Sequence, residues 1–411
     1  MKIAIPKECH SGETRVAISP EVVKKYTGLG FDVVIESNAG TAASFTDDMY
    51  KEAGATISKD AVSTLKAGDV ILKIMPPVGK EVSLMKKGAI LVSSLSALTD
   101  PKGMEALAKK GVTAFAMELV PRITRAQSMD ILSSQSNLAG YQSILEGANE
   151  FGRSFPMMMT AAGTIAPARV FIMGVGVAGL QAIATGKRLG GIVTATDVRP
   201  ATREQVESLG GKFLEVDAEM EKDAQTEGGY AKEMPPEYFA KQKVVVAEHL
   251  TKQDIVVTTA LIPGRPAPVL ITEDMVAAMK PGSVIVDIAV ESGGNCPLSK
   301  PGQVVVTKNG VRIVGTTNLP GKLAEDASAL FSKNLFNFLS PFLNKETGKV
   351  EIDWEDEVIK GTLITRDGSV VNQRVLDAKP TPAKPAAKAK PKAAAKPKAK
   401  PKTAPVEKGD K

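Results

Sequence analysis

The stretch "RVFIMGVGVAGLQAIATGKRLGGIVTATDVRP", from Arg169 to Pro200, joins two apolar strands through a glycine turn and a helix. Gly174, Gly176 and Gly179 follow the strand "VFIM" with the spacing G-x-G-x-x-G and open the helical run "LQAIATGKRLG". The first glycine permits the tight turn, the second lets the backbone approach a pyrophosphate, and the third lets the helix pack on the strand. Because the helix N-terminus then faces the phosphates, the pattern predicts a dinucleotide-binding βαβ unit.

An acidic residue ends the second strand of this unit. Asp197 closes "GIVTATD", eighteen residues after Gly179. A carboxylate there accepts hydrogen bonds from an adenosine ribose and repels a 2′-phosphate, so the sequence favours NAD over NADP. Arg199 lies two residues further on and would soften that exclusion. A glycine-rich turn that binds no ligand is the structural alternative.

The rest of the chain repeats the alternation of strands and helices. Up to about residue 120, β-rich runs such as "KIAIP", "DVVIES" and "DVILKIM" alternate with helical segments, and the second half continues with "QDIVVTTAL", "GSVIVDIAV" and "QVVVTKNGVRIVG". Continuous apolar strands separated by helices are typical of parallel sheets that are covered on both faces. A proline-free helical stretch that starts at Met129 would carry the chain from one sheet to the other.

We therefore predict an α/β protein with two Rossmann-like, doubly wound parallel-sheet domains and a cleft between them. The first domain comprises residues 1–128 with the returning segment 320–377, and the NAD(H)-binding domain comprises residues 129–319. Residues 378–411, "AKPTPAKPAAKAKPKAAAKPKAKPKTAPVEKGDK", contain nothing apolar enough to bury, so we expect a disordered Lys/Pro/Ala-rich tail.

Positive charge is concentrated in this tail. Eleven lysines against Glu407 and Asp410 give it a net charge of +9, so the whole-chain value of +6 leaves −3 for residues 1–377. The expected folded part is thus slightly acidic, and only 4% of the chain is aromatic, which argues against nucleic-acid binding. The tail is either a solvated spacer or a polybasic contact with an anionic membrane surface.

The compartment follows from the cysteines and the N-terminus. Cys9 and Cys296 are too few for a disulfide framework and fit a reducing compartment. The N-terminus has no apolar core of signal-peptide length, so we expect the chain to stay in the cytoplasm. The apolar run 170–186 contains four glycines and a glutamine, and it falls short of the roughly 20 predominantly apolar residues of a membrane span.

One polar cluster and one long insertion are candidates for a site. The segment "PRITRAQSMDILSSQ" gathers Arg122, Gln127, Asp130 and Ser133 at the start of the connecting helix, which places them beside the expected cleft. Residues 215–242 form a polar connection far longer than the usual 2 to 6 residues or so, which indicates a lid. A solvated loop is the alternative for both segments.

Few other side chains suggest chemistry. Arg15 and Lys73 are cations that would suit either a substrate carboxylate or a surface ion pair. His10 and His249 have neither metal-ligand spacing nor a neighbouring nucleophile, so we expect no metal site and assign neither histidine to catalysis. The sequence contains no Walker loop and no G-x-S-x-G elbow.

Together these motifs resemble the alanine dehydrogenase and proton-translocating transhydrogenase superfamily, over nearly the whole chain from Lys2 to about Val371. The resemblance is carried by "SGETRVAISP", "ILKIMPP", "GVGVAGLQAIATGKRLG", "TDVRP", "VDIAVESGGN" and "GTTNLPG". Within the superfamily, "MELVPRITRAQSMDILSSQSNLAGY" and "GGYAKEM" are similar to the NAD(H)-binding component of the transhydrogenase.

The resemblance implies hydride transfer from NADH on this chain to NADP⁺ on a partner subunit, coupled to proton translocation by membrane subunits. Alanine dehydrogenases use a histidine and an aspartate, and this sequence has Ser96 and Glu291 in their places. Hydride transfer between two nicotinamides removes no proton at the reacting carbon, so no general acid or base is needed. An amino-acid dehydrogenase and a non-catalytic NAD-sensing module remain the alternatives.

The same resemblance implies the residues of the site and the setting of the chain. Positioning of the nicotinamide for catalysis would fall to Arg122, Gln127, Asp130, Ser133 and Tyr230. The cofactor would be bound by these residues and by Ile123, Thr124, Arg125, Gly174, Gly176, Val177, Ala178, Gly179, Asp197, Val198, Arg199, Gly229 and Leu261. We also expect a homodimer that lies on the inner face of the bacterial cell membrane through its complex with membrane-embedded subunits.

Overall fold

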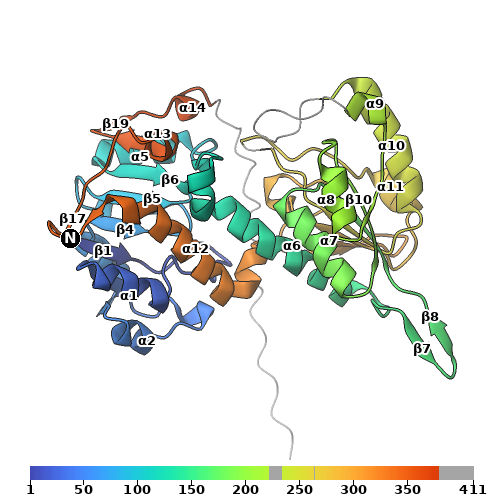
Figure 1. Ribbon diagram of the computed structural model, residues 1–411, viewed down its shortest axis with the longest axis horizontal. Coiled ribbons are helices and arrows are strands. Elements are labelled where there is room, and N and C mark those ends of the chain that lie inside the picture. The colour runs from blue at the N-terminus through green and yellow to red at the C-terminus, as the bar shows by residue number, and fades with distance from the viewer. Residues whose placement is uncertain (222–233, 263, 379–411) are drawn as a thin grey trace, which may run out of the picture. The chain divides into compact units, whose positions relative to one another are not determined.

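The computed structural model describes residues 1–221, 234–262 and 264–378, which form two large β-sheets flanked by helices and two short two-stranded sheets (Figure 1). The predicted α/β class with two parallel, Rossmann-like sheets is confirmed. The basic tail, from residue 379 onward, and most of the predicted lid, residues 222–233, lie outside the described residues.

The first sheet has the strand order β19-β18-β6-β5-β4-β1-β2-β3. Strands β1 to β6 are parallel, whereas β18 runs antiparallel to β6, and β19 runs antiparallel to β18. The segment near the C-terminus thus adds an antiparallel edge to a parallel sheet. The strands are β1 Lys2–Ile5, β2 Asp32–Glu36, β3 Thr56–Ser58, β4 Val70–Leu72, β5 Ile90–Ser93, β6 Thr113–Ala116, β18 Leu363–Arg366 and β19 Ser369–Val370.

Helices cover both faces of this sheet because its strands are apolar on both sides. In β1, Ile3 and Ile5 belong to a core cluster with α1 and α12, whereas Ala4 faces a second cluster with α3 and α5. This is the continuous apolar pattern that favours parallel strands. The helices of this part are α1 Pro20–Gly28, α2 Asp47–Glu52, α3 Ala61–Ala67, α4 Glu81–Leu84, α5 Pro101–Lys110, α12 Ala324–Leu339, α13 Glu357–Thr362 and α14 Gln373–Leu376.

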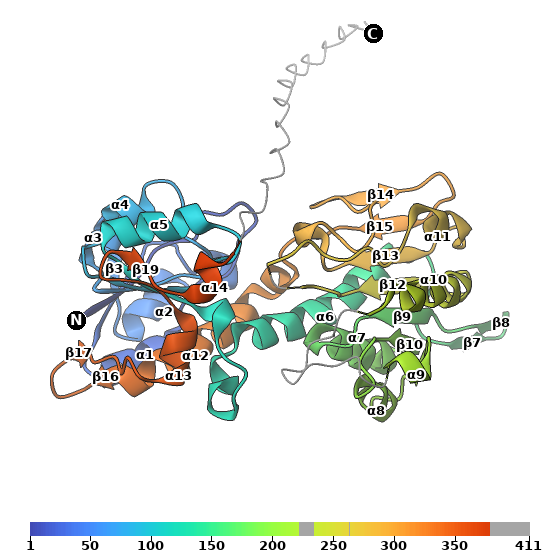
Figure 2. The ribbon, with the colours of Figure 1, turned by 90° about the horizontal axis from the view of Figure 1, so that it is seen from above.

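The second sheet has the order β11-β10-β9-β12-β13-β15-β14, which Figure 2 shows from β14 to β10. The chain leaves β9 toward β10 on one side and later returns to β12 on the other, so the strand order reverses between β9 and β12. Open α/β sheets bind their ligands at such a reversal. The strands are β9 Arg169–Met173, β10 Ile192–Thr196, β11 Lys212–Phe213, β12 Ile255–Thr258, β13 Val284–Asp287, β14 Val304–Val306 and β15 Arg312–Val314.

The second sheet is also covered on both faces. Val170 and Ile172 of β9 pack with α6, α7 and α8, and Phe171 and Met173 pack with α10 and α11. The helices are α6 Ile131–Glu150, α7 Val177–Arg188, α8 Thr202–Ser208, α9 Ala218–Glu221, α10 Pro236–Leu250 and α11 Glu273–Ala278. Among the described helices, none is both long enough and apolar enough to cross a bilayer.

The segment "QVVVTKNGVRIVG" differs from its prediction. Instead of supplying one strand of a parallel sheet, it forms two strands, β14 and β15, which pair antiparallel. Gly310 turns the chain between them with a φ of +82°, and the Thr307 amide donates to the Val311 carbonyl at 2.9 Å. The "NG" dipeptide between two valine-rich runs is a hairpin signal that explains the difference.

Two segments link the sheets. Helix α6 follows the 3₁₀ helix η3, Thr124–Met129, and leads from the first sheet to the second. The chain returns through the 3₁₀ helix η5, Leu319–Leu323, and α12. Before the second sheet, β7 (Met158–Thr160) and β8 (Gly163–Ile165) form a short antiparallel hairpin that the sequence patterns did not indicate.

Candidate nucleotide-binding site

The glycine turn between β9 and α7 has the geometry that its spacing predicts. Gly174 has a φ of +100°, a conformation that favours glycine. A Cβ on Gly179 would lie 1.9 Å from the Gly174 carbonyl oxygen, so the first turn of α7 needs glycine at this position. A Cβ on Gly176 would meet nothing within 4 Å. The turn is therefore closed beneath the helix and open at its second glycine, where a pyrophosphate would approach.

The N-terminus of α7 suits an anion. Gly176 is its N-cap residue, and among the described residues no side chain caps the helix. The first amide groups of the helix therefore lack an intrahelical acceptor and carry the positive end of the helix dipole. At the start of this helix Val177 is 38% exposed and Ala178 is half-buried. A phosphate fits this arrangement.

Asp197 lies directly beside the glycine turn. Its carboxylate accepts hydrogen bonds from the Val175 amide at 2.7 Å, from the Arg199 amide at 2.9 Å, and from Arg199 Nε and Nη2 at 2.8 and 2.7 Å. An ionised carboxylate has about four lone-pair sites, and these four bonds fill them. The hydrogen bonds to Asp197 raise the pKa of Arg199. A ribose hydroxyl can therefore reach Asp197 only if Arg199 gives up part of its contact.

The loop after β12 braces the glycine turn from the other side. The Thr259 hydroxyl donates to the Gly174 carbonyl at 3.0 Å. Asn295 holds the next residue, because its amide side chain accepts from the Ala260 amide at 3.1 Å and donates to the Ala260 carbonyl at 2.9 Å. Leu261 follows with 51% of its side chain exposed. Thr259 and Asn295 were not identified from the sequence, since no motif links them to the glycines.

The predicted nicotinamide cluster lies on η3 and the start of α6. Asp130 is the N-cap of α6, and its carboxylate accepts from the Ser133 amide at 2.9 Å and from the Ser133 hydroxyl at 2.5 Å. Arg122, Thr124, Arg125 and Gln127 are exposed, and Ile123 is half-buried. The structure thus brings these residues together on one short loop, and it also gives Asp130 and Ser133 a structural task as a helix cap.

Some predicted residues of the adenosine side and the lid fall near or within the undescribed segment. Val198 is half-buried and packs on a small cluster formed by Met234 and Tyr238, immediately after that segment. Gly229 and Tyr230 lie outside the described residues. The undescribed segment lies between α9 and α10, which are joined by the Tyr238 hydroxyl, which donates to Glu221 at 3.0 Å.

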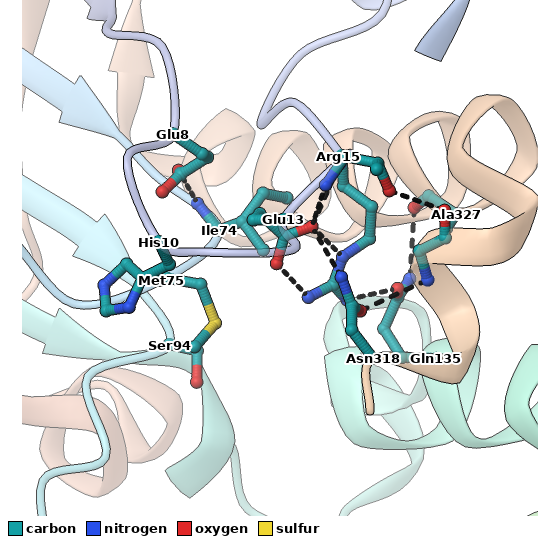
Figure 3. A network of polar contacts seen from close by, with 12 residues as sticks. Glu8, His10, Glu13, Arg15, Ile74, Met75, Ser94, Gln135, Asn318 and Ala327 are labelled. Carbon is teal, nitrogen blue, oxygen red and sulfur yellow. Dashed lines mark hydrogen bonds and ion pairs between the residues drawn. The ribbon is translucent and has the colours of Figure 1, made fainter. Parts of the chain in front are cut away.

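The two cations of the first sheet have internal partners. Arg15 donates through Nε and Nη2 to Glu13, at 2.8 and 2.7 Å, and through Nη1 to Gln135 of α6 at 2.8 Å (Figure 3). Lys73 is fully buried between Glu8, at 3.1 Å, and Glu81, at 3.2 Å. Burial opposes the charge of Lys73, but the two carboxylates prevail and raise its pKa. Neither cation is a simple surface residue.

The remaining polar candidates carry structural contacts. His10 pairs with the Pro76 carbonyl at 2.9 Å, and His249 lies against the Phe171 ring with Thr194 at 2.8 Å. Glu291 accepts from the Asn318 amide at 3.1 Å. Ser96 has a φ of +52°, in a turn whose neighbouring amides donate to the half-buried Glu118. Within the described ranges, no group of three or more His, Cys, Asp or Glu side chains could hold a metal ion.

Strand, glycine turn, helix N-terminus and strand-end carboxylate together define a dinucleotide-binding α/β protein. Two models of protein families match most of the chain. "Alanine dehydrogenase/PNT, N-terminal domain" matches residues 4–139, and "Alanine dehydrogenase/PNT, C-terminal domain" matches residues 143–373. The chain belongs to the alanine dehydrogenase/PNT family, and is therefore a member of an oxidoreductase family.

Individual relatives come from both branches of the family. A protein of Rhodospirillum rubrum, named as the first portion of NAD(P) transhydrogenase subunit alpha, is 62% identical over 377 residues, which cover 90% of this chain and 98% of the relative. An alanine dehydrogenase of Methanococcus maripaludis is 30% identical over 398 residues, covering 95% of this chain and 99% of the relative. The crystal structure of transhydrogenase from Sinorhizobium meliloti matches with a TM-score of 0.81 at 49% identity, covering 90% of this chain and all of the other.

Proposed function

We propose that this chain is the NAD(H)-binding subunit of a proton-translocating NAD(P) transhydrogenase. In this proposal, NADH held here gives a hydride directly to NADP⁺ on a partner subunit, and membrane subunits couple the transfer to proton movement. The observation that carries the proposal is the similarity over 98% of the length of a relative named as a transhydrogenase alpha subunit. The open glycine turn with Asp197 at its side supports NAD(H) as the ligand.

NAD(H) supplies the hydride chemistry, and this chain's residues would bind and orient it. The amides of the first turn of α7 would hold the pyrophosphate, and Asp197 the adenosine ribose, once Arg199 releases part of its contact. Leu261, with the lid residues Gly229 and Tyr230, would close over the nucleotide and exclude water. The exposed side chains of Arg122 and Gln127 would fix the nicotinamide end. Since no proton leaves the reacting carbon, this step needs no general acid or base, and the distance between the two nicotinamide rings enters its rate directly.

The direct test reconstitutes the full chain with its NADP-binding and membrane subunits. We expect hydride transfer between the two nucleotides, and we expect Gln127→Asn to slow it strongly while NADH affinity changes less, because distance at the reacting carbon enters the rate directly. Gln373→Asn is the matched control, since Gln373 is equally an exposed glutamine but lies on α14.

The same preparation separates the alternatives. Turnover of the purified chain with alanine and NAD, without partners, would assign it to the amino-acid dehydrogenases. NADH binding without transfer in the complete complex would leave an NAD-sensing module. Unchanged turnover in Gln127→Asn would return the η3 loop to a purely structural role.

The β7–β8 hairpin supports the proposal of a homodimer. Four exposed apolar residues lie on the hairpin or directly before it, with exposed fractions of 57% for Met157, 45% for Met158, 76% for Met159 and 40% for Ile165. Such an apolar hairpin is costly to expose to water and would be covered by a second copy of the chain. We expect Met159→Lys to shift sedimentation toward the monomer, whereas Val244→Lys, at a 69% exposed position on α10, should not.

A further inference from the structure

We propose that Asn334, in the middle of α12, is a positioning residue for Gln127. The inference rests on the proposed function, because it concerns how the exposed carboxamide of Gln127 is held in place for hydride transfer. Asn334 lies 207 residues further along the chain, yet its side chain contacts the residue that follows Gln127.

Asn334 ties the η3 loop to the start of α6. Its Nδ2 donates to the Ser128 carbonyl at 2.8 Å, and its Oδ1 accepts from the Ser134 hydroxyl at 2.7 Å. Asn337, one turn further along α12, donates to the same Ser128 carbonyl at 3.1 Å. A carbonyl has two lone pairs, so this oxygen is fully used. The backbone next to Gln127 is therefore fixed by two side chains of one helix.

The burial of Asn334 argues for a specific role. Asn334 is 7% exposed, and the larger buried side chains of this helix, such as Phe331, Leu335 and Phe338, are apolar, whereas its other buried polar residues are two serines. Burying an amide costs free energy unless it is fully hydrogen-bonded, and an apolar residue would pack there without that requirement. Among the described residues, this amide donates to Ser128 and accepts from Ser134. Its presence is thus explained by holding the loop rather than by filling the core.

Apolar packing fixes the underside of the loop and leaves Gln127 on top. Ala126 and Met129 are 1% and 6% exposed and belong to the same core cluster as Phe331 and Leu335. The opposite end of η3 is held by Arg125, whose Nη2 contacts Asp356 at 2.8 Å. Arg125 is 49% exposed, and an ion pair so open to solvent contributes little. Asn334 is therefore the principal buried polar tether of this loop.

The test compares Asn334→Asp and Asn334→Ala with the same substitutions at Asn372. Asn372 is also 7% exposed, and it donates to the Leu363 carbonyl at 2.9 Å and accepts from the Arg374 amide at 3.1 Å, at the first-sheet edge. Asn334→Asp keeps the volume but turns an acceptor toward the Ser128 carbonyl. The measurements are the thermal midpoint and NADH affinity of the full chain, and single-turnover hydride transfer in the reconstituted complex.

We expect both Asn334 variants to lower hydride transfer by on the order of tenfold or more, because small misplacements at the reacting centre cost up to about a hundredfold. NADH affinity should stay within about twofold of the unsubstituted chain. The Asn372 variants should lose comparable thermal stability without losing rate. If the Asn372 variants lose as much hydride-transfer rate as the Asn334 variants for the same loss of thermal midpoint, the positioning role is wrong. If the unsubstituted complex transfers no hydride, the proposed function itself fails.

Discussion

Asp197→Asn offers the sharpest test of cofactor choice, because it keeps the volume of the side chain and removes its charge. Hydrogen bonds to a carboxylate are roughly twice as strong as bonds to a neutral acceptor, so losing the charge should weaken NADH binding by about 1.4 kcal/mol, or about tenfold. A 2′-phosphate carries a charge of about −1.5 to −2, and removing one negative charge at about 4 Å in water relieves a further 1.5 to 2 kcal/mol or so of repulsion from NADPH. The preference for NADH should therefore fall by about a hundredfold.

The neighbouring guanidinium acts in the same direction. Arg199 donates two side-chain hydrogen bonds to Asp197. The neutral side chain of Asp197→Asn would hold the Arg199 guanidinium less firmly, so the guanidinium could turn toward a 2′-phosphate. The assay is titration of the isolated chain with NADH and NADPH, followed by cofactor fluorescence. Asp254→Asn is the control, since Asp254 is also a buried carboxylate that accepts a backbone amide, that of Arg169, at 2.8 Å, but at the opposite end of β9. An unchanged preference in Asp197→Asn, or an equal change in Asp254→Asn, would refute the ribose-acid argument.

Three further outcomes are expected. Burial lowers the pKa of His249 below its usual 6.5, so below pH 6.5 this residue binds more protons in the unfolded chain than in the folded chain. We expect it to make stability fall by up to about 1.4 kcal/mol per pH unit as the pH drops, and we expect His249→Gln to reduce this dependence in urea titrations at pH 5 to 7. Saturating NADH should protect residues 223–234 from limited proteolysis, and equal cleavage with and without NADH would contradict the lid. Deleting residues 378–411 should leave NADH binding and dimerisation intact but weaken sedimentation with anionic vesicles at low salt, by the loss of about 1 kcal/mol per contacting lysine; equal sedimentation would leave the tail as a spacer.

Local patterns made part of this molecule predictable. The glycine spacing, the strand-end Asp197 and the apolar strands each depend on residues close in sequence, and the structure has the predicted strand, glycine turn and helix with Asp197 beside the turn. Prediction was weaker where one pattern has two explanations. Asp130 and Ser133 form the D-x-x-S signature of a helix N-cap, and the sequence gives no means of separating that role from ligand binding.

Contacts between distant segments could not be predicted. Asn295 reaches Ala260 across 35 residues, and Asn334 reaches Ser128 across 206 residues. Asparagine is usually a surface or turn residue, so neither position stands out until the fold buries it beside a loop. Lys73 stood out as a cation, but its two carboxylate partners could not be predicted, because they come from a loop after β1 and from α4.

The close approach of α6 to α7 has a consequence for the spacing of the whole nucleotide. A Cβ on Gly140, midway along α6, would lie 2.1 Å from the Ala178 carbonyl in the first turn of α7, so the two backbones touch there. Ten residues earlier, Asp130 begins the same helix beside Gln127. A rigid helix of that length measures about 15 Å, and in the proposed function it would set the distance between the pyrophosphate site and the nicotinamide site. One residue inserted between 131 and 139 would lengthen the helix by about 1.5 Å and rotate one end by about 100°. In the proposed function, a change in the number of residues in α6 would therefore displace the two ends of the nucleotide site relative to each other.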